Sequence, residues 1–143
     1  MPVYETPQDR ENELRVAKIV AEKSSTLLIK LDLMLYPVDF GFYLPGSDIP
    51  GSQGMLKFLA EVKCRTCKPT TFSHYMIGLG KWENIRNYPY KCGLFVEFAD
   101  GEIYACGRNA PYEVRMGKRE EMRREFDMEP CAFIPMEAFR RWA

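Results

Sequence analysis

The stretch Leu59–Cys67, LAEVKCRTC, alternates apolar and polar side chains and therefore predicts a β-strand. Alternation puts Glu61 and Lys63 together on one face, with apolar residues on the other. An acid and a lysine at this spacing can belong to a metal-dependent hydrolytic site, whereas Cys64 and Cys67 can form half of a zinc site. The same pattern also occurs in ordinary half-exposed strands, so the strand has to be interpreted together with its neighbours.

A second alternating run, Val38–Leu44, precedes this strand. The sequence between the two runs contains PGSDIPGSQG, which is dense in turn-forming residues. We therefore expect Val38–Leu44 and Phe58–Arg65 to pair as a hairpin with a long loop. The residues expected to share the apolar face of the first strand are Val38, Phe40, Phe42 and Leu44. In this phase Asp39 and Glu61 would project from the same face of the sheet.

Two carboxylates on a rigid pair of strands are suited to a hard divalent cation such as Mg²⁺. Val62 follows the acid; its side chain would face the core, and its carbonyl offers a further oxygen ligand. Lys63, on the same face as Glu61, would hold a water molecule or offset the negative charge that develops on a phosphate. A metal ion and an ammonium group at a phosphodiester are together suited to its hydrolysis, while the same alternation is also typical of an ordinary half-exposed strand.

The remaining sequence predicts an α/β fold. Thr6 is a candidate N-cap for the first helix, with Pro7 at its first position and Asp9 three residues after the cap. This helix is expected over Thr6–Glu22. Two further helices are expected at His74–Asn87 and Met136–Trp142, and further strands at Thr26–Tyr36, Leu94–Phe98 and Glu102–Cys106. No repeat or linker divides the chain. We therefore expect one domain, residues 1–143, with a central mixed β-sheet flanked by helices.

Bulk composition restricts the class of protein. The 20 Lys and Arg residues balance the 20 Asp and Glu residues, so any surface that attracts nucleic acid has to be local. The N-terminal sequence has neither the basic start nor the apolar run of a signal peptide, and no apolar stretch is long enough to span a membrane. Five cysteines are more typical of reduced thiols than of a disulfide framework. We expect a cytoplasmic protein.

Two other features have competing interpretations. A zinc site at Cys64 and Cys67 would need two further ligands, but the other three cysteines form no second pair and His74 is the only histidine. Cys64 also lies on the apolar face of its strand, where a small thiol packs well. The segment Arg115–Glu125 has five basic and three acidic residues. It is suited equally to contacts with a phosphate backbone and to a solvated network of salt bridges.

Four motifs resemble the PD-(D/E)XK nuclease superfamily, and in particular small phage-encoded members of it. They are YPVD at Tyr36–Asp39, AEVKCR at Ala60–Arg65, YMIGLGK at Tyr75–Lys81 and DMEPCAFIP at Asp127–Pro135. The resemblance extends over about Asp9–Phe139. This sequence departs from the pattern in two places: Val38 separates the proline from Asp39, and Gly78 stands where a serine is expected.

The resemblance implies a restriction-endonuclease-like core and a Mg²⁺-dependent DNA endonuclease of the resolvase type, with Mn²⁺ as a substitute metal, DNA as the partner and a possible homodimer. It implies that Asp39, Glu61 and Lys63 are catalytic. Metal ligands would be Asp39, Glu61 and the Val62 carbonyl, with Glu13 assisting directly or through water. Arg65, Tyr75 and Lys81 would lie near the substrate. The alternative is a catalytically inactive phage accessory protein that binds a partner through the same scaffold. A basic rim around the Asp39–Glu61 face favours the nuclease, whereas a mixed or apolar surface favours the binding protein.

Overall fold

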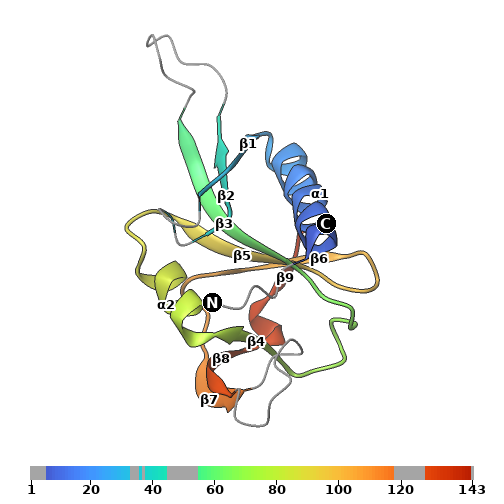
Figure 1. Cartoon of the computed structure of the whole chain (residues 1–143), viewed down its shortest axis with the longest axis vertical. Helices are drawn as coiled ribbons and strands as arrows, with labels where there is room; N and C mark the ends of the chain where they lie inside the picture. The colour runs from blue at the N-terminus through green and yellow to red at the C-terminus, as the bar shows by residue number, and fades with distance from the viewer. Residues whose placement is uncertain (1–5, 33–35, 37, 45–54, 118–127, 143) are drawn as a thin grey trace.

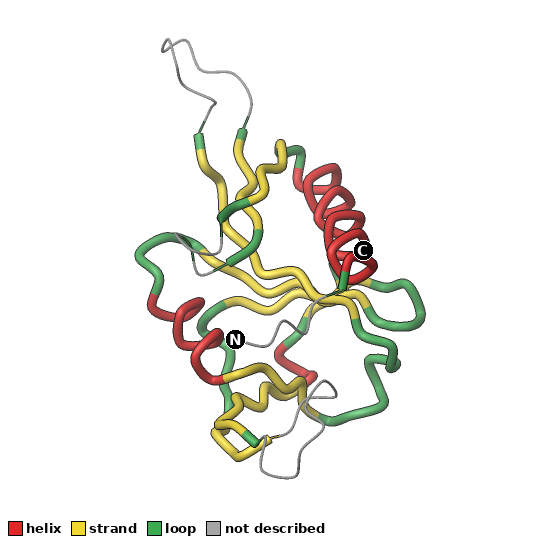
Figure 2. Tube along the Cα trace, in the orientation of Figure 1, coloured by secondary structure: helices red, strands yellow, loops and turns green. Residues whose placement is uncertain are grey.

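The computed structural model describes residues 6–32, 36, 38–44, 55–117 and 128–142, which form a mixed α/β fold (Figures 1 and 2). The elements are α1 (Pro7–Ser24), β1 (Leu27–Lys30), β2 (Phe40–Tyr43), β3 (Leu56–Cys64), β4 (His74–Gly78), α2 (Leu79–Asn87), β5 (Cys92–Glu97), β6 (Ile103–Gly107), β7 (Glu113–Gly117), β8 (Glu129–Pro135), the 3-10 turn η1 (Met136–Ala138) and β9 (Arg140–Arg141).

The strands form two sheets. A six-stranded sheet has the order β1-β2-β3-β5-β6-β9, in which β3 and β5 are parallel and the other neighbours are antiparallel. A three-stranded antiparallel sheet has the order β4-β8-β7 and lies with α2 at the opposite end of the molecule from α1 (Figure 1). The expected central mixed sheet with flanking helices is confirmed, while the second sheet was not predicted.

Helix α1 covers one face of the large sheet. Thr6 caps it as expected: its side chain accepts a hydrogen bond from the backbone N–H of Asp9, and the Asp9 carboxylate accepts one from the N–H of Thr6. Pro7 occupies the first helical position. The buried residues between helix and sheet are Val16, Ala17, Val20, Ala21, Phe40, Phe42, Ala60, Val62, Phe95 and Ile103. This packing fixes which face of β3 is left for a site.

A second hydrophobic cluster fills the space between the large sheet, α2 and the three-stranded sheet. From α2 it contains Trp82 and Ile85, which are fully buried. The strands contribute Leu59, Leu94, Val96, Tyr75, Ile77, Ala132 and Ile134. Strand β3 therefore lies between two packed layers, and its residues alternate between them.

Several expected elements match the structure closely. The predicted hairpin is present as β2 and β3, with Phe40 opposite Ala60 and Phe42 opposite Phe58. The rings of Phe42 and Phe58 stack at 4.6 Å. The predicted second hairpin is present as β5 and β6, which reverse at Gly101 with a φ of 81°. Positions 45–54, where we expected the long loop, lie outside the described residues.

Four expectations were wrong. The strand expected over Thr26–Tyr36 is only β1, Leu27–Lys30, and Leu31, Asp32 and Tyr36 lie outside any strand. Only the second half of His74–Asn87 is helical, because His74–Gly78 pairs with β8 and buries Tyr75 and Ile77 in the alternation of a strand. The expected terminal helix is the short turn η1 followed by β9, which pairs with β6. Val38 joins the cluster under α2 rather than that of Phe40 and Phe42, because β2 begins only at Phe40 and the alternation does not reach back to residue 38.

Candidate active site

Two buried carboxylates face each other at the edge of the β2–β3 pairing. Because Phe40 pairs with Ala60 in antiparallel strands, the same register brings Asp39 opposite Glu61. Asp39 is 3% exposed and Glu61 is 1% exposed. Acidic side chains are rarely buried to this degree unless they are paired or bind a cation. The two residues that the sequence placed on one face are thus brought together.

Lysine ammonium groups contact both oxygens of Glu61. Lys63 Nζ lies 3.2 Å from Glu61 Oε1, and Lys81 Nζ lies 3.1 Å from Glu61 Oε2. Lys63 comes from β3 itself, whereas Lys81 comes from the first turn of α2 on the face of the sheet that Glu61 shares with Leu94. Both lysine side chains are about one-third exposed. These two lysines therefore lie between the buried carboxylate of Glu61 and the protein surface.

Two further side chains complete the cluster. Lys63 Nζ is 3.5 Å from Glu13 Oε1, so the lysine lies between a carboxylate of α1 and one of β3. On the other side, Lys30 Nζ is 3.4 Å from Asp39 Oδ1 and 4.8 Å from the centre of the Phe40 ring. Lys30 is half exposed. The pattern of the sequence did not identify Lys30, because its position opposite Phe40 depends on the pairing of β1 with β2.

Burial dominates the electrostatics of Glu61. It raises the pKa of this carboxyl group; the nearby Asp39 carboxyl group acts in the same direction, while Lys63 and Lys81 oppose it. For Lys63 burial disfavours the charged form, but the carboxylates of Glu61, Glu13 and Asp39 outweigh it and raise the pKa of the ammonium group. The site therefore holds a fully charged lysine beside an acid that is costly to ionise.

The donor set fits a hard divalent cation. Among the described residues no group donates a well-formed hydrogen bond to either oxygen of Glu61, although both are fully buried. Nor do three His, Cys, Asp or Glu side chains in the described part of the chain lie close enough to form a metal centre. Mg²⁺ needs only one or two protein carboxylates, since it keeps several of its water molecules. Asp39 and Glu61 meet that requirement, whereas the Lys63 ammonium separates Glu13 from Glu61.

Of the expected substrate-binding residues, Lys81 joins the site and the other two pack together. The guanidinium of Arg65 lies 5.1 Å from the centre of the Tyr75 ring. Tyr75 is only 5% exposed and meets Phe139 edge-on at 5.6 Å. Tyr75 is thus a core residue that supports Arg65. The side chain of Val62 is fully buried as expected, and the use of its carbonyl as a ligand stays a prediction.

The cysteine pair does not form the alternative site. Cys64 packs with the α1 cluster, and burial raises its pKa to about 11, so its thiol is neutral at physiological pH. Cys67 packs against the cluster under α2 instead. Because the two thiols join different hydrophobic clusters, this geometry does not favour a shared zinc ion.

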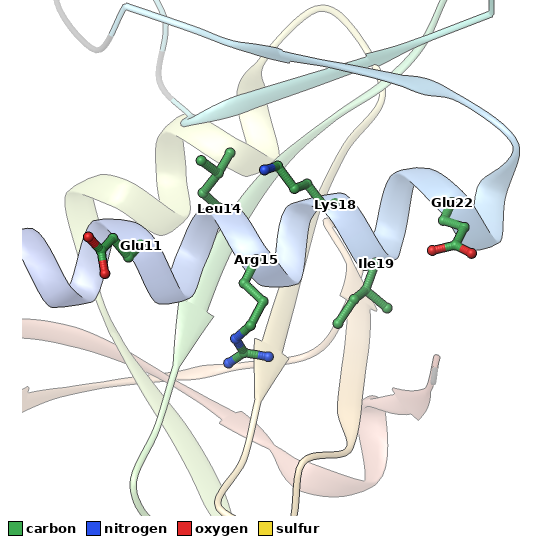
Figure 3. A pocket seen from close by; sticks show the side chains of 6 residues that line it. All are labelled: Glu11, Leu14, Arg15, Lys18, Ile19 and Glu22. Atoms are coloured by element: carbon green, nitrogen blue, oxygen red, sulfur yellow. The ribbon is translucent and has the colours of Figure 1, made fainter.

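A shallow pocket elsewhere has no relation to the acidic cluster. It runs along α1 and is lined by Glu11, Leu14, Arg15, Lys18, Ile19 and Glu22 (Figure 3). All of these residues belong to one helix, so the pocket is a groove on its outer surface. Arg15 is held there by a two-pronged contact with Glu97 on β5, at 2.8 and 2.6 Å. This contact anchors one turn of α1, the turn that carries Glu13, to the large sheet.

A stability measurement tests the electrostatics of Glu61. The raised pKa means that the folded protein binds the proton of the Glu61 carboxyl group more tightly than the unfolded chain does. The contribution of this protonation to the free energy of unfolding is therefore complete below the ordinary pKa of 4.5 and is lost as the pH rises through the folded-state pKa. Without metal, Glu61→Gln should therefore be more stable than wild type at pH 8, by about 1 kcal/mol, the scale of a buried polar group that lacks hydrogen bonds. The advantage should shrink towards pH 4.5. Urea unfolding in EDTA at several pH values measures it, and parallel curves for the two proteins would contradict the assignment.

The fold and the acidic pair together define a class. A mixed sheet in which an aspartate directly precedes one strand, and the next strand supplies an acid, a hydrophobic residue and a lysine, is the arrangement of the PD-(D/E)XK proteins. The chain belongs to the phage putative PDDEXK endonuclease family, whose sequence profile matches residues 1–142. This match confirms the resemblance seen in the sequence. Neither the curated proteins nor the solved structures give a significant match. Among the described residues no helix is long and apolar enough to cross a membrane.

Proposed function

We propose that this protein is a Mg²⁺-dependent DNA endonuclease with a restriction-endonuclease-like core, acting in the manner of a resolvase. The observation that carries the proposal is the buried Asp39–Glu61 pair with Lys30, Lys63 and Lys81 around it. An acidic centre suits a divalent cation, and a rim of partly exposed ammonium groups suits the phosphates of a nucleic acid. In a binding protein these two carboxylates would serve only as ion-pair partners of the surrounding lysines.

The residues take separate roles in the proposed reaction. Asp39 and Glu61 would hold the metal ion, which would supply Lewis-acid chemistry at the scissile phosphate and lower the pKa of a water molecule. Lys63 orients the attacking water and stabilises the charge that grows on the phosphate, because its ammonium is fixed and charged. Glu13 holds Lys63 in place. The water would release a proton to the solvent, its oxygen would form the new bond to phosphorus, and the bond to the leaving oxygen would break.

The proposed DNA contacts extend beyond the metal site. Lys30 and Lys81 contact phosphates on either side of the metal, and Arg65, supported by Tyr75, contacts the backbone further along. A homodimer would double this basic surface and suit a branched substrate. Such an enzyme would meet its DNA in the cytoplasm of the host cell.

A cleavage assay tests the proposal. Linear, nicked, branched and single-stranded DNA, together with a matched RNA, are incubated with wild type and Glu61→Gln in Mg²⁺, in Mn²⁺ and in EDTA. We expect metal-dependent cutting of at least one DNA by wild type and a rate slower by about 10³-fold or more for Glu61→Gln, because the substitution removes a ligand charge. Folded wild type that cuts none of these substrates in either metal would overturn the proposal and favour the binding protein.

A further inference from the structure

The site holds three carboxylates and three lysines joined by ion pairs. Within the described residues these are Glu13, Asp39, Glu61, Lys30, Lys63 and Lys81. Their formal charges cancel without any bound ion. A divalent cation would therefore bring two excess positive charges into a largely buried cluster, which is unfavourable in a medium of low dielectric constant. The charge of a bound phosphodiester would offset part of that excess.

Two of the lysines contact Glu61 from different elements. Lys63 stands on β3 and contacts Glu13 as well as Glu61. Lys81 reaches the other oxygen of Glu61 from α2, 3.1 Å away, with a side chain that is 31% exposed. A lysine side chain is a flexible four-carbon stem and can swing outward from a helix without moving the backbone. Its ammonium group thus occupies one of the two oxygens with which Glu61 could bind a metal ion.

We infer that Lys81 is an internal counter-ion that competes with the divalent metal for Glu61 and transfers to a substrate phosphate when metal and DNA bind. This inference rests on the proposed function and adds a regulation to it. In the free protein Lys81 weakens metal binding. With DNA present, the same ammonium gains a phosphate partner, so DNA strengthens metal binding and metal strengthens DNA binding by the same factor. Metal and DNA therefore bind cooperatively, and the enzyme without DNA binds metal weakly.

Metal binding without turnover tests the inference. Isothermal titration calorimetry with Mn²⁺, in the absence of DNA, compares wild type with Lys81→Met and Lys81→Gln. We expect both variants to bind Mn²⁺ about tenfold more tightly than wild type, within the usual range of coupling between sites. Lys81→Arg keeps the charge and should bind Mn²⁺ close to the wild-type affinity. Lys57→Met is the matched control, because Lys57 lies on the same strand as Glu61 and donates to the Ser24 carbonyl, away from the site.

A second readout follows the coupling to DNA. Fluorescence anisotropy measures binding of a phosphorothioate-substituted duplex with and without Mn²⁺. Wild type should bind this duplex more tightly when Mn²⁺ is present, and in Lys81→Met most of that enhancement should be lost. Equal or weaker Mn²⁺ affinity in both neutral variants would overturn the inference while leaving the metal site intact. Wild type that binds no Mn²⁺ under either condition would overturn the inference and the proposed function together. Circular dichroism establishes that each variant is folded.

Discussion

Lys63→Met is expected to reduce the rate of DNA cleavage by about 10²–10³-fold while leaving the fold intact. The factor is that seen when one preorganised group that stabilises developing charge is removed from an active site. Lys63 is suited to such a role because it is held between Glu13 and Glu61, 3.5 and 3.2 Å away, and stays charged. Single-turnover cleavage at saturating Mg²⁺ measures the chemical step directly.

The control for this variant lies on the same strand. Lys57→Met removes a lysine of β3 that is exposed and remote from the acids, so it should cleave at nearly the wild-type rate. Methionine keeps the length and apolar stem of the lysine, so packing changes little. A Lys63→Met enzyme with wild-type activity would show that the strand motif is structural and that water activation depends on another group.

Trp82→Ala is expected to be severely destabilising. Trp82 is fully buried, packs in the cluster between α2 and the large sheet and meets the Tyr112 ring edge-on at 6.1 Å. Truncating a buried aromatic residue of this size costs about 3–5 kcal/mol. The thermal midpoint should therefore fall by roughly 10 °C or more. Differential scanning calorimetry in EDTA measures the change without interference from bound metal.

This substitution also tests how the site is held. Lys81 precedes Trp82 on α2, so loosening the helix should displace the ammonium from Glu61. Tyr90→Ala is a suitable control, since Tyr90 is 41% exposed and should lose much less stability. A loss of less than about 1 kcal/mol for Trp82→Ala, far below the usual cost of such a truncation, would mean that α2 does not depend on this cluster.

The centre of the fold could be predicted because local patterns specify it. Alternation in β2 and β3 indicates the hairpin and its phase, so the sequence alone places Asp39 and Glu61 on one face. The start of α1 followed from its capping box, formed by Thr6 and Asp9, and from Pro7 at the first helical position. These signals depend only on residues that are close in the sequence, and tertiary contacts do not override them.

The elements that were missed depend on distant pairing. His74–Gly78 becomes a strand only because β8, more than 50 residues further along, pairs with it. Strand β9 consists of Arg140 and Arg141, with no apolar alternation to reveal it. The position of Lys30 beside Asp39 depends in the same way on the register of β1 against β2. Contacts of this kind are set by tertiary structure and leave little trace in local sequence.

The most direct test of the central claim is divalent-metal binding to the Asp39–Glu61 pair in the presence of DNA. Calorimetric titration of Mn²⁺ into wild type bound to a phosphorothioate-substituted duplex should give a saturable site. Asp39→Asn and Glu61→Gln should each lose that site while retaining cooperative thermal unfolding. Saturable binding that is unchanged in both variants, or its absence from wild type, would contradict the assignment of these two buried carboxylates as the metal ligands.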